Sequence, residues 1–200
     1  MKILFVSQHY RPEPFRLSDI CEDLVERGHE VTVLTGIPNY PEGKIYADYR
    51  NKQNRRETIE GVTVFRSYTI PRGKSTLHRI LNYFSFAISS SIGVLLGQYK
   101  AKDGSEFDCV FVNQSSPVMM AWAGMAYKNK YKKPLFLYCM DVWPDSLTVG
   151  GVKQDGLVFK LFKFISKKVL LPPLSKQCPR KQTHKLCSLF FQVPKLLPIN

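Results

Sequence analysis

The chain has 200 residues, of which 44% are hydrophobic, and this is enough for one soluble domain with a buried core. Its net charge of +13 would favour a nucleic acid or a membrane as partner. However, residues 156–200 hold eight lysines, one arginine and no acidic residue, so this segment alone supplies +9. The remaining +4 on residues 1–155 argues against nucleic acid as a partner of the domain.

Buried strands and amphipathic helices alternate along residues 1–168. Lys2–Ser7 is an apolar run of β-forming residues, typical of a strand buried on both faces. Arg16–Arg27 carries an apolar helical stripe that Gly28 ends, whereas Gly36–Glu60 is polar and is predicted to be a long loop. The other predicted strands are Val31–Thr35, Val62–Tyr68, Asp108–Asn113 and Leu135–Met140, and the other predicted helices are Leu77–Tyr99, Val118–Asn129 and Gly156–Lys168. This order predicts an α/β fold, a Rossmann-like, doubly wound parallel sheet.

The pattern changes near Val169. Residues 170–200 contain five prolines, no acidic residue and no sustained period. We therefore expect one domain over residues 1–168 and a disordered basic tail over residues 169–200, and we expect the chain to stop before a second domain. A reading-frame shift near Val169 would explain the tail, and the coding DNA downstream tests this hypothesis. Cys178, His184 and Cys187 lie in the tail, and we interpret their spacing as chance, so no metal site is predicted.

Candidate binding residues follow the predicted strands, because open parallel sheets bind ligands beyond the carboxyl ends of their strands. The amide, carboxyl and aromatic groups found there suit the hydroxyl groups of a sugar. No GxGxxG pattern follows the first strand, which argues against a dinucleotide. The candidates are Glu13 and Arg16 in residues 8–16, Asn39 and Tyr40 in residues 36–43, Asn113 and Ser115 at the end of the fourth strand, and Trp143 and Asp145 after the fifth.

Each of these groups also has a purely structural interpretation. Glu13 and Arg16 would then be solvated loop charges, and residues 36–43 a rigid turn built on proline and glycine. Asp145 would cap a helix and Trp143 would belong to the core. The residues alone leave both interpretations open.

A basic segment precedes a long uncharged helix. Ile80–Gly97 spans 18 residues without charge, but Asn82 and several serines argue against a membrane span. Arg72, Lys74 and Arg79 stand just before it or at its start, and they are predicted to contact anionic lipid. The alternative is a buried core helix with a basic start. Since the N-terminus is typical of a strand rather than a signal peptide, we expect a cytoplasmic protein.

Three segments together resemble a known family. They are KILFVSQHYRPEPFRLSD, GHEVTVLTGIPNYPEGKIY and, further on, MDVWPDS. Over residues 1–168 the sequence resembles the N-terminal domain of family 4 glycosyltransferases with the GT-B fold. Among these, it is most similar to bacterial enzymes of O-antigen and capsule synthesis, including fucosamine transferases.

The resemblance implies half of a GT-B fold and a retaining transferase of hexosyl or amino-sugar groups. The N-terminal domain would hold the acceptor, a polyprenyl-diphosphate-linked saccharide at the cytoplasmic face of the inner membrane. The donor would be a nucleotide-sugar bound by the second domain, with no other cofactor. Asp141 matches the acidic residue of the D-x-W-P-x-S motif and is the candidate catalytic residue. The chain alone would then be inactive.

Two other functions remain open from the sequence. One is a GT-B-fold sugar-nucleotide epimerase, which would convert its nucleotide-sugar without an acceptor. The other is a non-catalytic module that binds lipid-linked sugar. Product analysis with and without an acceptor separates a transferase from an epimerase.

Overall fold

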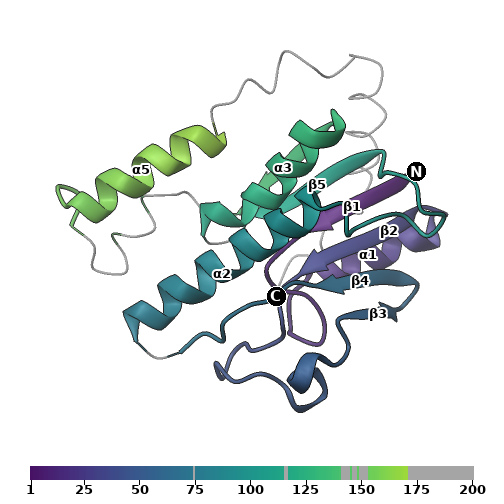
Figure 1. Ribbon diagram of the computed structural model, residues 1–200, viewed down its shortest axis with the longest axis horizontal. Coiled ribbons are helices and arrows are strands. Elements are labelled where there is room, and N and C mark those ends of the chain that lie inside the picture. Colours follow the sequence, from purple (N-terminus) through teal and green to yellow (C-terminus); the bar gives the residue numbers. More distant parts are fainter. Residues whose placement is uncertain (74, 115–116, 141–144, 146–147, 149–152, 171–200) are drawn as a thin grey trace, which may run out of the picture.

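A six-stranded sheet forms the centre of the molecule (Figure 1). A computed structural model describes residues 1–73, 75–114, 117–140, 145, 148 and 153–170. The strand order is β3-β4-β2-β1-β5-β6, and all neighbouring strands are parallel except β3 and β4. The strands are β1 (Lys2–Val6), β2 (Glu30–Thr35), β3 (Arg56–Ile59), β4 (Val62–Arg66), β5 (Cys109–Gln114) and β6 (Leu135–Cys139). The predicted α/β, doubly wound sheet is therefore confirmed.

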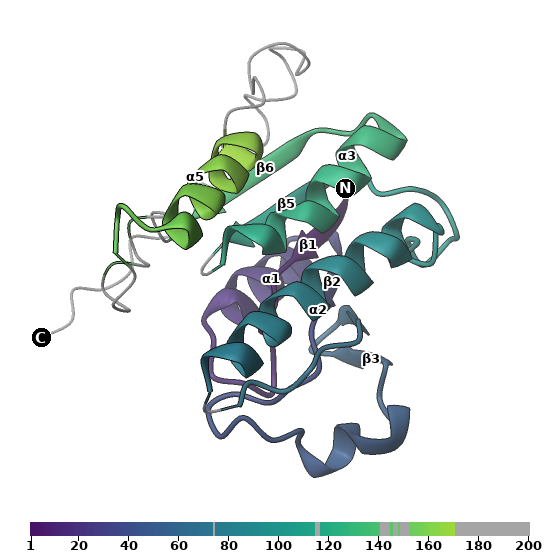
Figure 2. The same ribbon diagram turned by 60° about the vertical axis from the view of Figure 1, so that its left-hand side comes forward.

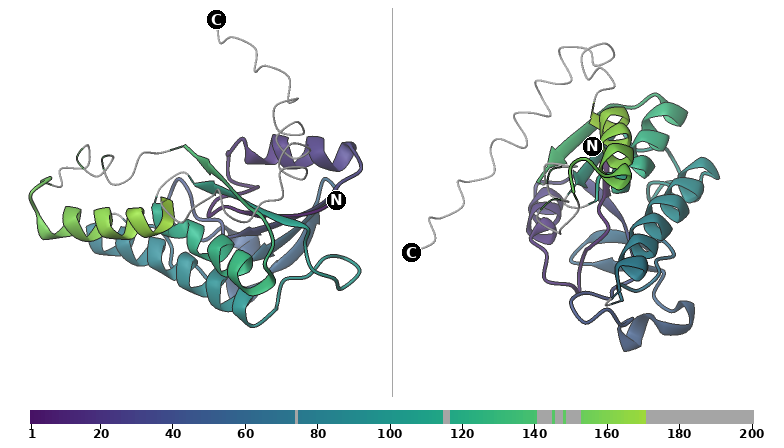
Figure 3. Two further views of the ribbon diagram at one scale, coloured as in Figure 1. Left: turned by 90° about the horizontal axis from the view of Figure 1, so that it is seen from above. Right: turned by 90° about the vertical axis from the view of Figure 1, so that its left-hand side faces the viewer.

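Helices cover both faces of the sheet. They are α1 (Leu17–Glu26), α2 (Thr76–Leu95), α3 (Trp122–Tyr131) and α5 (Leu157–Leu170), with the short 3-10 helices η1 (Ala47–Lys52) and η2 (Val118–Ala121). Figure 3 shows α1 on one side of the sheet and α2, α3 and α5 on the other. Successive side chains of a strand point to opposite faces of the sheet. In β1, Ile3 and Phe5 therefore pack under α1, while Leu4 and Val6 pack under α2 and η2.

The chain reverses its direction of winding between β1 and β5. From β1 the strands continue through β2 to β4, and α2 then carries the chain back so that β5 pairs with β1 on its other side. The loops after β1 and β5 therefore leave the sheet next to each other. In open α/β sheets this switch point is where ligands bind, so its loops are the first place to look for a site.

The prediction of an unstructured loop over residues 36–60 was wrong in part. This segment contains η1 and the edge strand β3, which forms a hairpin with β4. The two residues of the turn, Glu60 and Gly61, both have positive φ values of 46° and 77°, as a type I′ turn requires. Glutamate is an uncommon residue there, and β3 exposes polar side chains at the sheet edge, so neither turn nor strand has a strong sequence signal.

Helix α2 has an inner and an outer apolar face. Phe86, Ala87 and Val94 lie in the core. The outer face exposes large apolar side chains at helical spacing, namely Leu81, Ile88, Ile92 and Leu95, followed by Leu96. Among the described residues, no helix combines the length and the hydropathy needed to cross a bilayer.

Candidate functional site

The loops after β1 and β2 meet at the carboxyl edge of the sheet. The backbone N–H of Gly36 donates to the Gln8 carbonyl at 3.0 Å, and the Thr35 hydroxyl donates to the same oxygen at 3.2 Å. These bonds hold residues 8–16 against residues 36–43, as the strand order predicts. The two loops therefore form one wall of a candidate site.

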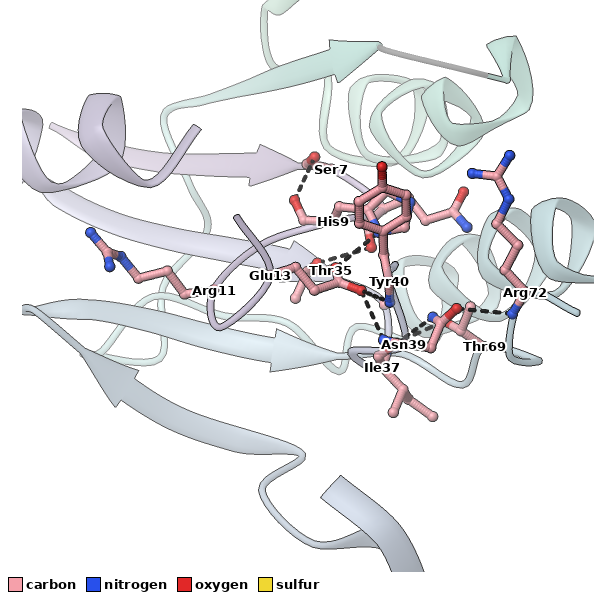
Figure 4. Close-up of polar contacts among 12 residues, drawn as sticks. Ser7, His9, Arg11, Glu13, Thr35, Ile37, Asn39, Tyr40, Thr69 and Arg72 are labelled. Atoms are coloured by element: carbon pink, nitrogen blue, oxygen red, sulfur yellow. Dashed lines mark hydrogen bonds and ion pairs between the residues drawn. The ribbon is translucent and has the colours of Figure 1, made fainter. Parts of the chain in front are cut away.

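The Glu13 carboxylate is the hub between these loops (Figure 4). Its Oε1 accepts hydrogen bonds from the backbone N–H groups of Asn39 and Tyr40, at 2.8 and 2.7 Å. Its Oε2 lies 2.8 Å from Nδ1 of His9. Because Glu13 is only 3% exposed, its carboxyl oxygens are bound by these protein groups rather than by solvent.

Asn39 joins the second loop to the segment that leads into α2. Its Nδ2 donates to the Ile37 carbonyl at 2.8 Å, and its Oδ1 accepts from the backbone N–H of Arg72 at 2.9 Å. Gly43 N–H donates to the Asn39 carbonyl at 2.7 Å. Asn39 is only 1% exposed, so it holds the second loop in place through these hydrogen bonds rather than through contact with solvent.

Three aromatic rings pack together above the Glu13 hub. The imidazole of His9 stacks on Phe15 with 4.7 Å between ring centroids, and Tyr40 meets His9 edge-on at 5.8 Å. The Tyr46 hydroxyl donates to the Tyr40 carbonyl at 2.7 Å. Burial raises the pKa of Tyr46, so its hydroxyl stays a neutral donor at physiological pH. Tyr40 and Phe15 are only half-buried, so part of their ring surface faces solvent.

Side chains also connect the two strands at the switch point. Nδ2 of Asn113, in β5, donates to the Ser7 hydroxyl at 3.4 Å, and this hydroxyl donates to the His9 carbonyl at 3.0 Å. On the α2 side, Nε2 of Gln8 donates to Oδ1 of Asn82 at 2.7 Å. The first loop is thereby fixed to β5 and to α2.

Arg66 supports both loops from below. Its side chain is 1% exposed and forms an ion pair with Glu57 of β3 at 2.6 Å. It also donates to the Arg11 carbonyl at 2.6 Å and to the Gly36 carbonyl at 3.5 Å, one in each loop. The guanidinium lies 4.5 Å from the ring centroid of Tyr49, a buried residue of η1. Burial raises the pKa of the Tyr49 phenol. One buried cation thus ties the edge hairpin to the wall of the site.

The predicted site residues fall into three groups. Those that the structure brings together at the carboxyl edge are Glu13, Asn39 and Tyr40, with Asn113 joined to them through Ser7. Four others lie away from this cluster or at its border. Arg16 at the start of α1, Arg79 and Asp145 are exposed, and Arg72 is half-buried. Those outside the described residues are Lys74, Ser115, Asp141 and Trp143.

His9, Phe15 and Arg66 were not among the predicted site residues. The sequence signal for His9 was its spacing from Glu13, four residues later in the same loop, where Glu13 stands between two prolines. Arg66 ends a buried strand, and an arginine in that position indicates a buried ion pair, but its partner Glu57 stood in a segment predicted to be a loop. No group of three or more potential metal ligands occurs within the part of the chain that the structure describes.

No protein-family model matches the chain. It is 38% identical over 96 residues to a protein of Escherichia coli (strain K12) whose name, still provisional, is colanic acid biosynthesis glycosyl transferase WcaI. That match covers 45% of this chain and 23% of the E. coli protein, so the chain matches less than a quarter of the relative's length. Among solved structures, the calicheamicin glycosyltransferase CalG4 superposes with a TM-score of 0.45 and 14% identity, over 90% of this chain and 44% of that one. The resemblance to family 4 glycosyltransferases of bacterial surface-polysaccharide synthesis is therefore confirmed over the stretch that the E. coli match covers.

Proposed function

We propose that the chain is the acceptor-binding half of a retaining glycosyltransferase that acts in the synthesis of a bacterial surface polysaccharide. The enzyme would transfer a hexosyl or amino-sugar group from a nucleotide-sugar to a polyprenyl-diphosphate-linked oligosaccharide, as in O-antigen or capsule synthesis. The observation that carries this proposal is the sequence identity with a protein named for glycosyl transfer in colanic acid synthesis. The conversion of a nucleotide-sugar without an acceptor is not favoured by any observation in this structure.

The geometry of the carboxyl edge supports an acceptor site. Half-buried aromatic rings lie beside buried polar groups whose positions are fixed by hydrogen bonds to the backbone. Such a surface suits a saccharide, which offers hydroxyl groups to polar side chains and C–H faces to aromatic rings. The glycine-rich turn that brings backbone N–H groups against a pyrophosphate is missing after β1, where residues 8–16 contain no glycine.

The first prediction concerns ligand selectivity. Titration of the ¹⁵N-labelled chain with a short-chain prenyl-diphosphate-linked disaccharide is expected to shift the amide signals of residues 8–16 and 36–43 in NMR spectra. A nucleotide-diphosphate sugar at the same concentration is expected to leave them in place, because the nucleotide belongs to the second domain of such an enzyme. Two results would contradict the proposal that these loops bind the acceptor. One is saturable binding of the nucleotide-sugar at these loops, and the other is a disaccharide that shifts none of their amide signals.

We also propose that the chain docks on the cytoplasmic surface of the inner membrane through the layer of helices that contains α2. The outer face of α2 exposes Ile88 by 48% and Ile92 by 50%, and Leu95 and Leu96 continue this stripe. Helix α5, in the same layer, exposes Leu157 and Leu161 by 87% and 55%. Large exposed apolar side chains grouped along a helix are characteristic of interaction surfaces.

The charges of this layer complement an anionic membrane. No acidic residue occurs in residues 61–102, 117–133 or 157–170, which include α2, α3 and α5. These segments carry lysines and arginines instead, so the charged side chains of these helices are basic, as an anionic surface requires. By contrast, α1 on the opposite face carries Asp19, Glu22, Asp23 and Glu26. Figure 2 shows α2 and α3 side by side in the helix layer that faces away from α1.

The second prediction tests this docking. The chain is expected to float with liposomes that contain phosphatidylglycerol and to stay behind with liposomes of phosphatidylcholine alone. Ile92→Glu is expected to lower the partition coefficient about tenfold or more, because burying an isoleucine side chain is worth about 1.5–3 kcal/mol. Gln53→Glu adds the same charge at an exposed polar position and is the matched control. Equal losses in both variants, or flotation that does not depend on anionic lipid, would exclude this surface.

A further inference from the structure

The imidazole of His9 is held on several sides at the carboxyl end of β1. Its Nδ1 lies 2.8 Å from Oε2 of Glu13, and its ring stacks on Phe15 with an interplanar angle of 11°. Tyr40 contacts another part of the ring, and the His9 carbonyl accepts from the Ser7 hydroxyl. Both the backbone and the ring of His9 are therefore fixed before any ligand binds, which is the usual arrangement of a group that orients a ligand.

Glu13 determines which nitrogen of His9 carries the proton. In its ionised form the Glu13 side chain can only accept hydrogen bonds, and its Oε1 already accepts two backbone N–H groups. The proton of the short contact between Oε2 and His9 must therefore sit on Nδ1. The neutral imidazole then has an unprotonated Nε2, which is a hydrogen-bond acceptor.

Nε2 of His9 is available to a ligand. It has no hydrogen-bond partner in the described part of the chain, and it is not one of the buried unpaired atoms there. The side chain keeps 10% exposure, so the ring is not closed off from solvent. The imidazole lies beside the half-buried ring of Tyr40 at the carboxyl edge of the sheet.

We propose that Nε2 of His9 accepts a hydrogen bond from a hydroxyl group of the saccharide acceptor, while the ring of Tyr40 packs against the same sugar. Glu13, which was predicted to contact the sugar directly, is then a positioning residue that acts through His9. Asn39 likewise positions Tyr40 and the second loop. This inference rests on the proposed function, because it takes the ligand to be the saccharide acceptor.

The test is NMR spectroscopy of the chain with ¹⁵N-labelled histidine. In the wild type we expect His9 to carry its proton on Nδ1, and we expect the prenyl-diphosphate-linked disaccharide to shift the Nε2 signal. His9→Phe keeps the ring contacts but removes both ring nitrogens, so Nε2 is lost together with the contact between Nδ1 and Glu13. The dissociation constant of the disaccharide is therefore expected to rise at least tenfold. His29→Phe is the matched control, because His29 precedes β2 at the opposite edge of the sheet.

The outcomes separate the inference from the proposed function. A wild-type proton on Nε2, or a disaccharide that binds His9→Phe as tightly as the wild type, overturns the role of His9 and leaves the acceptor site standing. A disaccharide that shifts no signal at the carboxyl edge overturns the proposed function, and with it the ligand assigned to His9. Thermal unfolding of His9→Phe shows whether the variant is folded. If it is unfolded, the role of His9 is decided by whether the disaccharide shifts the Nε2 signal of the wild type.

Discussion

Replacing Arg66 by alanine is expected to lower the free energy of unfolding by about 3 kcal/mol. The side chain is buried, and its removal leaves the carbonyl groups of Arg11 and Gly36 without their donor. The Glu57 carboxylate also loses its partner, but its 20% exposure allows some hydration, which places the loss at the lower end of the range for a buried pair. Chemical denaturation followed by circular dichroism measures the change.

Two variants show where the effect of Arg66→Ala comes from. Arg27→Ala removes an arginine that pairs with Asp23 at the surface of α1, where both side chains are about one-third exposed, and it is expected to cost about 0.5 kcal/mol. Arg66→Lys keeps the charge but not the fork of donors or the contact with the Tyr49 ring, so an intermediate loss is expected. If Arg66→Ala were as mild as Arg27→Ala, the buried network would not be what holds the loops to the hairpin.

The central strands were predictable because their environment is uniform. β1, β2 and β5 are buried on both faces, so most of their side chains are apolar, and the resulting apolar runs are visible in the sequence. β3 pairs with a single neighbour at the edge of the sheet, and its side chains alternate between exposed and half-buried. Its position depends on the Glu60–Gly61 turn and on the Arg66–Glu57 ion pair, which are tertiary features.

The location of the candidate site was predictable, but the roles of its residues were not. Glu13, Asn39 and Tyr40 follow parallel strands that are neighbours, so topology alone brings them to one edge. Whether a polar side chain points to solvent or inwards depends on the donors and acceptors that it meets. The partners of Glu13 are backbone groups 26 and 27 residues away, and no sequence pattern records them. The role of His9 likewise depends on Glu13, because Oε2 of Glu13 contacts its Nδ1.

Replacing Glu13 by alanine is expected to cost about 3 kcal/mol of stability and to loosen the second loop. The backbone N–H groups of Asn39 and Tyr40 would lose their common acceptor in a buried site, at about 1–3 kcal/mol for each unpaired group. We expect the amide hydrogens of both residues to exchange with solvent much faster, while those of the central strands follow only the change in global stability. Hydrogen exchange measured by NMR compares the two sets of amides directly.

Glu13→Gln separates the two tasks of this residue. The glutamine carbonyl oxygen can still accept from Asn39 and Tyr40, so most of the exchange protection should remain, with a loss of about 1 kcal/mol from the missing charge. Its amide nitrogen would then face Nδ1 of His9 as a donor, and the imidazole must accept there and carry its proton on Nε2. Saccharide binding should therefore fall even though the loop stays in place. If Glu13→Gln and Glu13→Ala expose the loop equally, then the charge of the carboxylate, rather than its geometry, holds the wall of the site together.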